Sequence, residues 1–346
     1  MGVDLGDAAI KRTITLESLS GKIIAIDAFN TLYQFLASIR QEDGTPLMDF
    51  KGRITAHLSG LFYRTARLVE NGIKPVYVFD GKPPSFKKRT IAERAQNKKE
   101  AEEKWKKALE EARYDDAKKY AQATSRLTQD MVEESKQLLT AIGIPYVQAP
   151  SEGEAQASVM VRNNLAYAAG SQDYDALLFG APLLVRNMSI TGRRKIPRQD
   201  RYILIEPEEI KLQETLKELQ ISQDQLILMG ILVGTDFNAG VKGVGPKTAL
   251  KIVKEHKTLD KIMLYVADKY KYEFEHDLEE VIEFFKNPPY VELKEKMAWG
   301  KVSKEGVDSI LVKEHDFSEE RINSTVDKLI KSFEEKGNQS KLETWF

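Results

Sequence analysis

The sequence predicts an α/β protein with a largely parallel central sheet and helices on both faces. Two short apolar runs, KIIAIDAF and KPVYVFDGKPP, carry Asp27 and Asp80 at the point where the apolar stretch ends. Between these runs, 31–40 and 54–70 have apolar residues at helical spacing. This β-α-β order is typical of a parallel sheet, because strands that are apolar throughout are covered on both faces.

The remaining elements continue this order along the chain. We expect strands at 144–150, 165–171, 182–187 and 201–206. We expect helices at 128–142, 152–163 and 222–233, and a charged, helical region beyond 255. The stretch 85–126 differs: Lys82 to Lys107 contains ten Lys/Arg against four Glu. A helix that is polar all round bridges solvent or is not stable alone.

Composition limits the function classes. With 346 residues, 42% of them hydrophobic, the chain can bury a large core, and a net charge of −1 restricts any nucleic-acid role to local patches. The absence of cysteine excludes disulfides and thiolate sites. No apolar run reaches the ~18–20 residues of a membrane span, and no signal peptide is recognisable. We therefore expect a soluble, intracellular protein in which any metal is bound by oxygen. The scattered histidines are expected at the surface or in packing: His57, His256, His276 and His315.

Six acidic residues follow predicted strands. They are Asp27, Asp80, Glu152, Glu154, Asp173 and Asp175. Ligands of open α/β sheets bind beyond the carboxyl ends of the strands, so we expect these side chains at one edge of the sheet. Asp236, which follows the helix at 222–233, adds a seventh.

Each acid alone also suits a structural role. Ser151 and Glu154 have the spacing of a capping box, Glu152 suits a helix N-terminus, and Asp27 or Asp80 can begin a loop. As a set they repel one another, by ~3 kcal/mol for a pair ~5 Å apart at an effective dielectric of ~20. No Lys or Arg adjoins either acid–x–acid pair in the sequence. Ligation by oxygen alone selects Mg²⁺ or Mn²⁺, and two such ions can hydrolyse a phosphodiester.

The blocks that carry these acids resemble the signature blocks of the flap endonuclease family of structure-specific 5′ nucleases. They are AIDAFNTLYQFL, FYRTARLVENGIKPVYVFDGKPP, GIPYVQAPSEGEAQAS, SQDYDALLFG and LVGTDF followed by GVKGVGPKTA, in the family's order. The chain is similar to the archaeal type, since it stops after a tail motif and lacks a long basic extension. The resemblance implies cleavage of 5′ flaps, with 5′–3′ exonuclease activity, in DNA replication (Okazaki fragment maturation) and repair.

The resemblance also implies a metal centre. Asp27, Asp80, Glu152 and Glu154 would serve one side of it, and Asp173, Asp175 and Asp236 the other. It implies two Mg²⁺ ions per site, replaceable by Mn²⁺, with some ligands acting through bound water. Many relatives carry smaller residues where this chain has Phe29-Asn30, a departure that we expect to affect packing more than chemistry.

The basic stretch resembles the helical arch of the family. Lys87 and Arg94 lie seven residues apart, on one helix face, and match the catalytic pair that reaches the scissile phosphate. A solvated charged helix is the alternative. We expect the arch to be mobile alone and ordered by substrate.

Tyr33 matches a residue that stacks on a base, with core packing as the alternative. Arg40 and Arg64 match DNA-contacting positions, although surface arginines would look the same.

Residues 234–249 resemble the helix–two-turn–helix that holds duplex DNA, with K⁺ as a further ion. Gly234, Gly243, Gly245 and Lys247 would bind backbone phosphates. Alternatively, the glycines only permit a tight helix–helix connection.

The end of the chain matches the peptide that binds the sliding clamp PCNA. Gln339, Leu342, Trp345 and Phe346 would enter a hydrophobic groove of the clamp; a disordered end with incidental aromatics is the alternative. We expect a monomer apart from the clamp, and branched or flapped DNA as substrate.

The resemblance also implies a division of the chain. The expected regions are 1–98 (N-terminal nuclease region, arch about 85–126), 116–258 (internal nuclease region, in the same catalytic domain), 259–335 (C-terminal helical part) and 336–346 (clamp-binding tail). Two other functions stay open: a related 5′–3′ exonuclease or gap nuclease, and a clamp-tethered scaffold that binds DNA junctions without catalysis.

Overall fold

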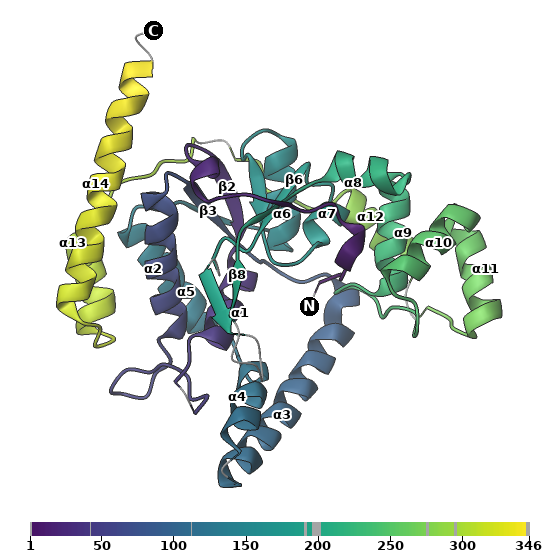
Figure 1. Ribbon diagram of the computed structural model, residues 1–346, viewed down its shortest axis with the longest axis horizontal. Helices are drawn as coiled ribbons and strands as arrows, with labels where there is room; N and C mark the ends of the chain where they lie inside the picture. Colours follow the sequence, from purple (N-terminus) through teal and green to yellow (C-terminus); the bar gives the residue numbers. More distant parts are fainter. Residues whose placement is uncertain are drawn as a thin grey trace.

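The protein consists of a central sheet between two layers of helices, with a long helical pair that extends away from it (Figure 1). The structure is a computed structural model, and it describes residues 2–41, 43–111, 113–189, 192–195, 202–274, 277–293 and 296–343. In Figure 1 the C-terminal helix α14 stands at one end of the molecule and α10 and α11 at the other, with the sheet between them.

Seven strands form the sheet, in the order β1-β9-β6-β5-β2-β3-β4. The five strands from β6 to β4 are parallel, whereas β9 is antiparallel to β6 and β1 is antiparallel to β9. Their bounds are β1 Arg12–Thr13, β2 Ile23–Asp27, β3 Lys74–Phe79, β4 Tyr146–Gln148, β5 Ala168–Gly170, β6 Leu183–Arg186 and β9 Glu208–Lys211. The prediction of a largely parallel sheet is confirmed.

Helices cover both faces of this sheet. One face packs against α1 (Ala28–Ser38), α2 (Ala56–Glu70) and α5 (Gln129–Ala141), with α13 (Lys304–Val307) and α14 (Glu319–Glu343) outside them. The other face packs against α6 (Gly153–Arg162), α7 (Asp175–Leu178), α8 (Leu212–Leu219), α9 (Gln223–Val233) and α12 (Leu278–Lys286). Beyond α9 lie α10 (Pro246–His256) and α11 (Leu259–Tyr270).

The central strand β2 is buried on both faces. Ile24 and Ile26 belong to the apolar cluster under α1 and α2, and Ala25 belongs to the cluster on the opposite face. This alternation explains why the strand is apolar throughout. Within the part of the chain that the structure describes, no helix has both the length and the apolar character of a membrane span.

The basic stretch forms an antiparallel pair of helices that extends from the domain (Figure 1). The pair consists of α3 (Lys88–Glu110) and α4 (Tyr114–Ala123). Ala101 and Ala108 are the buried residues of α3, and Ala117 and Ala121 of α4 are also buried. Small side chains let the two helices approach closely, while most of the charged side chains of α3 are exposed.

One predicted strand lies in a different place. Residues 202–205 form β8 (Tyr202–Ile205), but its assignment to the main sheet is wrong, because β8 pairs with β7 (Gly192–Lys195) in a separate antiparallel ribbon. The position beside β6 is taken by β9, which the sequence analysis did not predict. The apolar content of a segment favours a strand but does not specify its partner.

An aromatic cluster joins the segments that carry the candidate site. The ring of Phe237 makes edge contacts with four others, with centroids 5.5 Å from Phe86, 6.3 Å from Phe179, 5.1 Å from Phe284 and 5.2 Å from Phe285. These residues come from the start of the arch, from the C-cap of α7, from the loop after α9 and from α12. The cluster therefore holds the arch and the Asp236 loop in register.

Replacing Phe285, which is 1% exposed, with alanine is expected to destabilise the protein. Loss of a buried phenylalanine typically costs about 3–5 kcal/mol, because the cavity that it leaves does not close. Denaturant unfolding measures the change. Phe50→Ala is the matched control, since Phe50 is 94% exposed and should change stability by less than about 0.5 kcal/mol. Equal losses in the two variants would contradict the cluster's structural role.

Candidate functional site

The carboxyl ends of four neighbouring parallel strands bring six acids to one edge of the sheet. Asp27 is the last residue of β2, and Asp80 directly follows β3. Glu152 and Glu154 begin α6 just after β4, Asp173 lies in the turn between β5 and α7, and Asp175 is the first residue of α7. Parallel strands end at the same edge, and β4-β3-β2-β5 are consecutive in the sheet. The predicted convergence is therefore confirmed.

Asp236 reaches the same site from a different part of the fold. It lies in the loop after α9, and its charge raises the pKa of both Asp80 and Asp175. Asp27 interacts in the same way with Asp80, Asp173 and Glu152, and Glu154 interacts with Asp175. All seven acids thus belong to one electrostatic cluster.

Backbone N–H groups orient two of these acids. The N–H of Gly153 donates to Oδ1 of Asp80 at 2.7 Å, and the N–H of Asn30 donates to Oδ1 of Asp27 at 3.0 Å. The alternative reading of Ser151 and Glu154 as a capping box is wrong. The N-cap of α6 is Glu152, and it makes no side-chain cap. The acids at this helix start are therefore not used for capping.

Asn30 is a site residue that the sequence analysis missed. Its Nδ2 donates to Oδ2 of Asp173 at 3.0 Å, and its Oδ1 accepts from the N–H of Gln172 at 3.3 Å. The expectation that Phe29-Asn30 concerns packing more than chemistry is wrong for Asn30, because its amide orients a candidate ligand. The sequence offered one signal, a polar residue in the first turn of α1, which by itself did not identify a partner.

The N-terminus and Ser171 also contribute. The N–H of Val3 donates to Oδ1 of Asp175 at 2.7 Å, and the hydroxyl of Ser171 donates to Oε1 of Glu154. A Cβ atom at Gly2 would lie 2.5 Å from Oδ2 of Asp175, so only glycine fits there. Sequence reasoning had no means of placing residues 2 and 3 beside residue 175.

Burial and mutual repulsion disfavour ionisation of most of the cluster. Burial, and then the charge of Asp80, raises the pKa of Asp27 well above its usual range; burial and Asp175 do the same for Glu154. Burial, with Glu152, raises the pKa of Asp80 to about 7, and burial, with Asp236, raises the pKa of Asp175 to about 8. Full ionisation of these carboxyl groups would therefore need nearby positive charge.

Two arch cations supply part of that charge. Nζ of Lys87 contacts Glu152 and lies 3.5 Å from Oδ2 of Asp236, and the guanidinium of Arg94 pairs with Asp236. Burial opposes ionisation of Asp236, but Lys87 and Arg94 hold the pKa of this carboxyl below its usual value. The predicted common face of Lys87 and Arg94 is confirmed, and it faces the acids.

The donor set fits hard divalent cations by its chemistry. It consists of carboxylates only. Several of them are close neighbours that repel one another, and bound cations would remove this repulsion. Within the described ranges, no three or more His, Asp or Glu side chains are arranged to hold an ion in this conformation. Lys87 and Arg94 engage two of the acids, and Asn30 and Ser171 engage two others.

The other predicted contact residues lie around this centre. Tyr33, on α1, has Nζ of Lys98 4.6 Å from its ring centroid, so its ring faces the arch. Arg40 donates to the carbonyls of Leu36 and Gly44 and to the hydroxyl of Ser125, which leaves two of its five N–H groups. Arg64 lies on α2 and is half-buried.

The glycine-rich connection after α9 is folded tightly. Gly234 has φ +107°, and a Cβ there would lie 2.8 Å from the N of Gly240. These two glycines pack backbone against backbone, which supports the structural alternative for Gly234. Gly245 is the N-cap of α10 and makes no side-chain cap, while Gly243 and Lys247 are exposed beside it. Pro246, the first residue of α10, has no N–H, so the N–H groups of Lys247 and Thr248 are those available to an anion.

The tail residues can be placed only in part. Gln339 and Leu342 belong to the last turns of α14, although their side chains lie outside the described part of the structure. Trp345 and Phe346 lie beyond the described residues.

Known proteins resemble this chain over its whole length. Residues 5–101 match the XPG N-terminal domain, and residues 143–236 match the XPG I-region. The chain is 53% identical to Flap endonuclease 1 of Thermococcus onnurineus (strain NA1), over 100% of this chain and 99% of that protein.

Solved structures share the fold. Flap endonuclease-1 from Methanococcus jannaschii is 42% identical, with a TM-score of 0.76 over 97% of this chain and 100% of that one. The catalytic core of Rad2 in complex with DNA substrate has a TM-score of 0.70 at 24% identity, over 94% of this chain and 97% of that one. At that identity the second likeness concerns the fold alone.

The metal-free protein is expected to lose stability as pH rises between about 5 and 8. The pKa values of Asp27, Asp80, Glu154 and Asp175 are raised by folding, so the native state binds more protons than the unfolded chain in this window. Stability then falls as these acids ionise. Thermal unfolding in EDTA measures the fall, and added Mg²⁺ should restore most of the lost Tm.

Asp80→Asn is the matched control for this effect. The amide keeps an acceptor for Gly153 and removes one charge. Its metal-free Tm should exceed that of the unaltered protein near pH 8 and approach it near pH 5. Two results would contradict the conclusion that ionisation of these acids destabilises the fold. One is a Tm in EDTA that rises from about pH 5 to 8, and the other is the same dependence of Tm on pH in both proteins.

Proposed function

The chain belongs to the flap endonuclease family of structure-specific nucleases, and we propose that its seven-carboxylate cluster is the centre that hydrolyses DNA. The enzyme cleaves phosphodiester bonds at junctions between a 5′ single strand and duplex, with 5′–3′ exonuclease activity, in replication and repair. The observation that carries the site assignment is the gathering of carboxylates from four strand ends and one loop, beside two arch cations.

The carboxylates would hold two divalent ions, Mg²⁺ by preference, with Mn²⁺ able to replace it. Asp27, Asp80, Glu152 and Glu154 are assigned to one side, and Asp173, Asp175 and Asp236 to the other. When bound, such a pair of ions provides a nucleophilic water at neutral pH and stabilises the leaving oxygen. Asn30, Ser171 and the N–H groups of Val3 and Gly153 orient the carboxylates, as partners outside the ligand set do in other metal sites.

Lys87 and Arg94 are assigned to the scissile phosphate. In the structure they contact Glu152 and Asp236, two of the acids assigned to the ions. During the reaction they would offset the negative charge that develops on the phosphate.

The DNA would be bound by its backbone and its shape rather than by its sequence. Tyr33 is assigned to stacking on a base near the cut, and Arg40, through its two remaining N–H groups, and Arg64 to the strands beside it. The turn that contains Gly234, Gly243, Gly245 and Lys247 is assigned to phosphates of the duplex, with K⁺ as a further ion. Support comes from the uncapped start of α10.

The chain would work as one catalytic domain with two additions. Regions 1–98 and 116–258 form the nuclease part, with the arch at about 85–126 between them. Residues 259–335 form the C-terminal helical part. Residues 336–346 form the tail, which we assign to the sliding clamp PCNA through Gln339, Leu342, Trp345 and Phe346. The chain would be monomeric apart from the clamp.

Asp80→Ala is expected to reduce cleavage of a labelled 5′-flap substrate in Mg²⁺ by at least about a hundredfold, because partners outside the ligand shell alone are commonly worth 10–100-fold. DNA binding in EDTA should change little, since the cations that hold the DNA remain. Rates under single-turnover conditions and binding by fluorescence anisotropy measure the two effects.

Arg12→Gln is the control, because Arg12 pairs with Glu214 near the edge of the sheet, outside the cluster. Full cleavage by Asp80→Ala would reject the metal assignment. If the unaltered protein makes no metal-dependent cut in flap, nick, gap or bubble substrates, the result would support the alternative function, a clamp-tethered scaffold that binds DNA junctions without catalysis.

Trp345→Ala with Phe346→Ala is expected to abolish stimulation by the clamp. The apolar groove of a clamp binds such a peptide through its aromatic anchors, so their loss removes most of the contact. The measured quantity is the ratio of cleavage rates with and without the clamp, which should fall to about one. Stimulation that persists in this double variant would refute the clamp assignment.

A further inference from the structure

The turn between β5 and α7 presents two of the seven acids. Asp173 lies in this turn and Asp175 is the first residue of α7, so both depend on the path of the backbone from Ser171 to Tyr174. Within the turn, the hydroxyl of Ser171 accepts from the N–H of Asp173 at 3.2 Å. Further hydrogen bonds to this segment come from α1 and β6.

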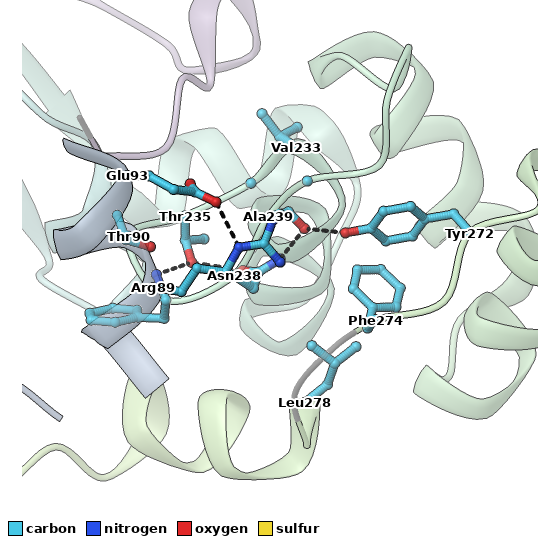
Figure 2. A pocket seen from close by; sticks show the side chains of 13 residues that line it. Arg89, Thr90, Glu93, Val233, Thr235, Asn238, Ala239, Tyr272, Phe274 and Leu278 are labelled. Carbon is cyan, nitrogen blue, oxygen red and sulfur yellow. Dashed lines mark hydrogen bonds and ion pairs between the residues drawn. The ribbon is translucent and has the colours of Figure 1, made fainter. Parts of the chain in front are cut away.

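The loop that carries Asp236 is held in a different way, by its own side chains. The hydroxyl of Thr235 donates to Oδ1 of Asn238 at 2.7 Å (Figure 2). Nδ2 of Asn238 then donates to the carbonyls of Ile231 and Ala239. This loop is therefore stabilised from within, whereas the turn at Asp173 is supported mainly by side chains of other elements.

Arg186, the last residue of β6, supports that turn. Its Nε donates to the carbonyl of Gln172 at 3.0 Å, and its Nη1 donates to the hydroxyl of Tyr174 at 2.6 Å. The guanidinium carbon lies 4.2 Å from the centroid of the Tyr174 ring. Nη1 also lies 3.2 Å from Oε2 of Glu208, the cross-strand neighbour of Arg186 on β9. One guanidinium thus holds the residues on both sides of Asp173.

Asn30 supports the same turn from the other neighbouring strand. It follows β2, and its Oδ1 accepts from the N–H of Gln172 at 3.3 Å. Because β5 lies between β2 and β6 in the sheet, Gln172 is held by side chains from both of its neighbours. The amide of Asn30 reaches the Asp173 carboxylate directly, whereas Arg186 contacts only the backbone and Tyr174.

The contacts of Arg186 are largely shielded from solvent. Its side chain is 18% exposed, and Tyr174 is buried. A planar guanidinium offers donors in fixed directions, so it can hold two acceptors at defined positions. A side chain without this fork would leave the carbonyl of Gln172 and the hydroxyl of Tyr174 without these donors, and the turn would lose its support on the β6 side.

We propose that Arg186 is a positioning residue of the metal centre, which holds Asp173 and Asp175 where they can ligate a divalent ion. The inference rests on the proposed function, because it deepens the role assigned to these two acids. Groups that orient metal ligands commonly change metal affinity 10–100-fold. Arg186 acts through the backbone rather than on a carboxylate, so we expect a smaller effect, of about 3–10-fold.

Charge alone predicts the opposite effect. The guanidinium places a positive charge beside a turn that carries two candidate ligands, so its loss would favour a bound cation. Loss of the guanidinium would also remove this partner of Glu208 and add to the negative charge nearby. Weaker metal binding after replacement of Arg186 therefore reports on the position of the ligands and not on the charge of the site.

Binding of Mn²⁺ to the DNA-free protein, measured by electron paramagnetic resonance, tests the proposal. Arg186→Gln is expected to raise the Kd for Mn²⁺ about 3–10-fold. In cleavage assays the half-saturating Mg²⁺ concentration should rise by a similar factor, while the rate at saturating Mg²⁺ changes less. Tyr174→Phe removes only the hydroxyl and should act in the same direction, with a smaller effect. The double variant should resemble Arg186→Gln, because both changes break one contact.

Arg12→Gln is the matched control, since Arg12 is another arginine of the sheet that pairs with a glutamate, Glu214, and it should leave Mn²⁺ binding unchanged. Thermal unfolding in EDTA shows whether each variant is folded. If Arg186→Gln binds Mn²⁺ as tightly as Arg12→Gln, or more tightly, the proposal is overturned.

Tyr174→Phe keeps the test decisive if Arg186→Gln does not fold. An unchanged Kd for Mn²⁺ in Tyr174→Phe would then overturn the proposal. A different result, no Mn²⁺ binding by the unaltered protein, would overturn the proposed metal centre itself and this inference with it.

Discussion

Electrostatic repulsion among seven carboxylates is the constraint on which the rest of this structure depends. A parallel sheet ends all its strands at one edge, so acids placed after β2, β3, β4 and β5 necessarily become neighbours. The fold reduces the cost with donors from every adjoining segment: Asn30 on Asp173, Gly153 on Asp80 and Val3 on Asp175. Burial nevertheless raises the pKa of several of these groups. Such a site lowers the stability of the folded protein, and cations can offset this cost.

The arch offsets part of that repulsion. Lys87 directly precedes α3 and Arg94 lies within it, and both pair with acids at the edge of the sheet. The aromatic cluster around Phe237 fixes the start of the arch against the Asp236 loop, so these cations have a defined position. The arch is therefore joined to the acid cluster both by these ion pairs and by the aromatic rings.

Several features of the site were within reach of the sequence, and others were not. An acid after an apolar strand, with a helical segment between two such strands, was enough to predict Asp27 and Asp80 at one edge. Asn30 and Ser171 could not be assigned, because a single polar residue in a helix or a turn has many uses and its partner is distant in the sequence. The capping box at Ser151 was wrong for a related reason: the local pattern fits, but the acid is used by the site.

Local chemistry in the sequence alone determined most of the strands and helices, the parallel order of the central strands and the identity of the seven acids. These follow from apolar periodicity and from the residues that end each strand, which are properties of short segments. Tertiary structure alone decided that β8 leaves the main sheet, that residues 2 and 3 pack against Asp175, and that Lys87 and Arg94 contact Glu152 and Asp236. Such pairings join segments far apart in the chain, and their energies depend on burial and on several groups at once. No short stretch of sequence contains that information.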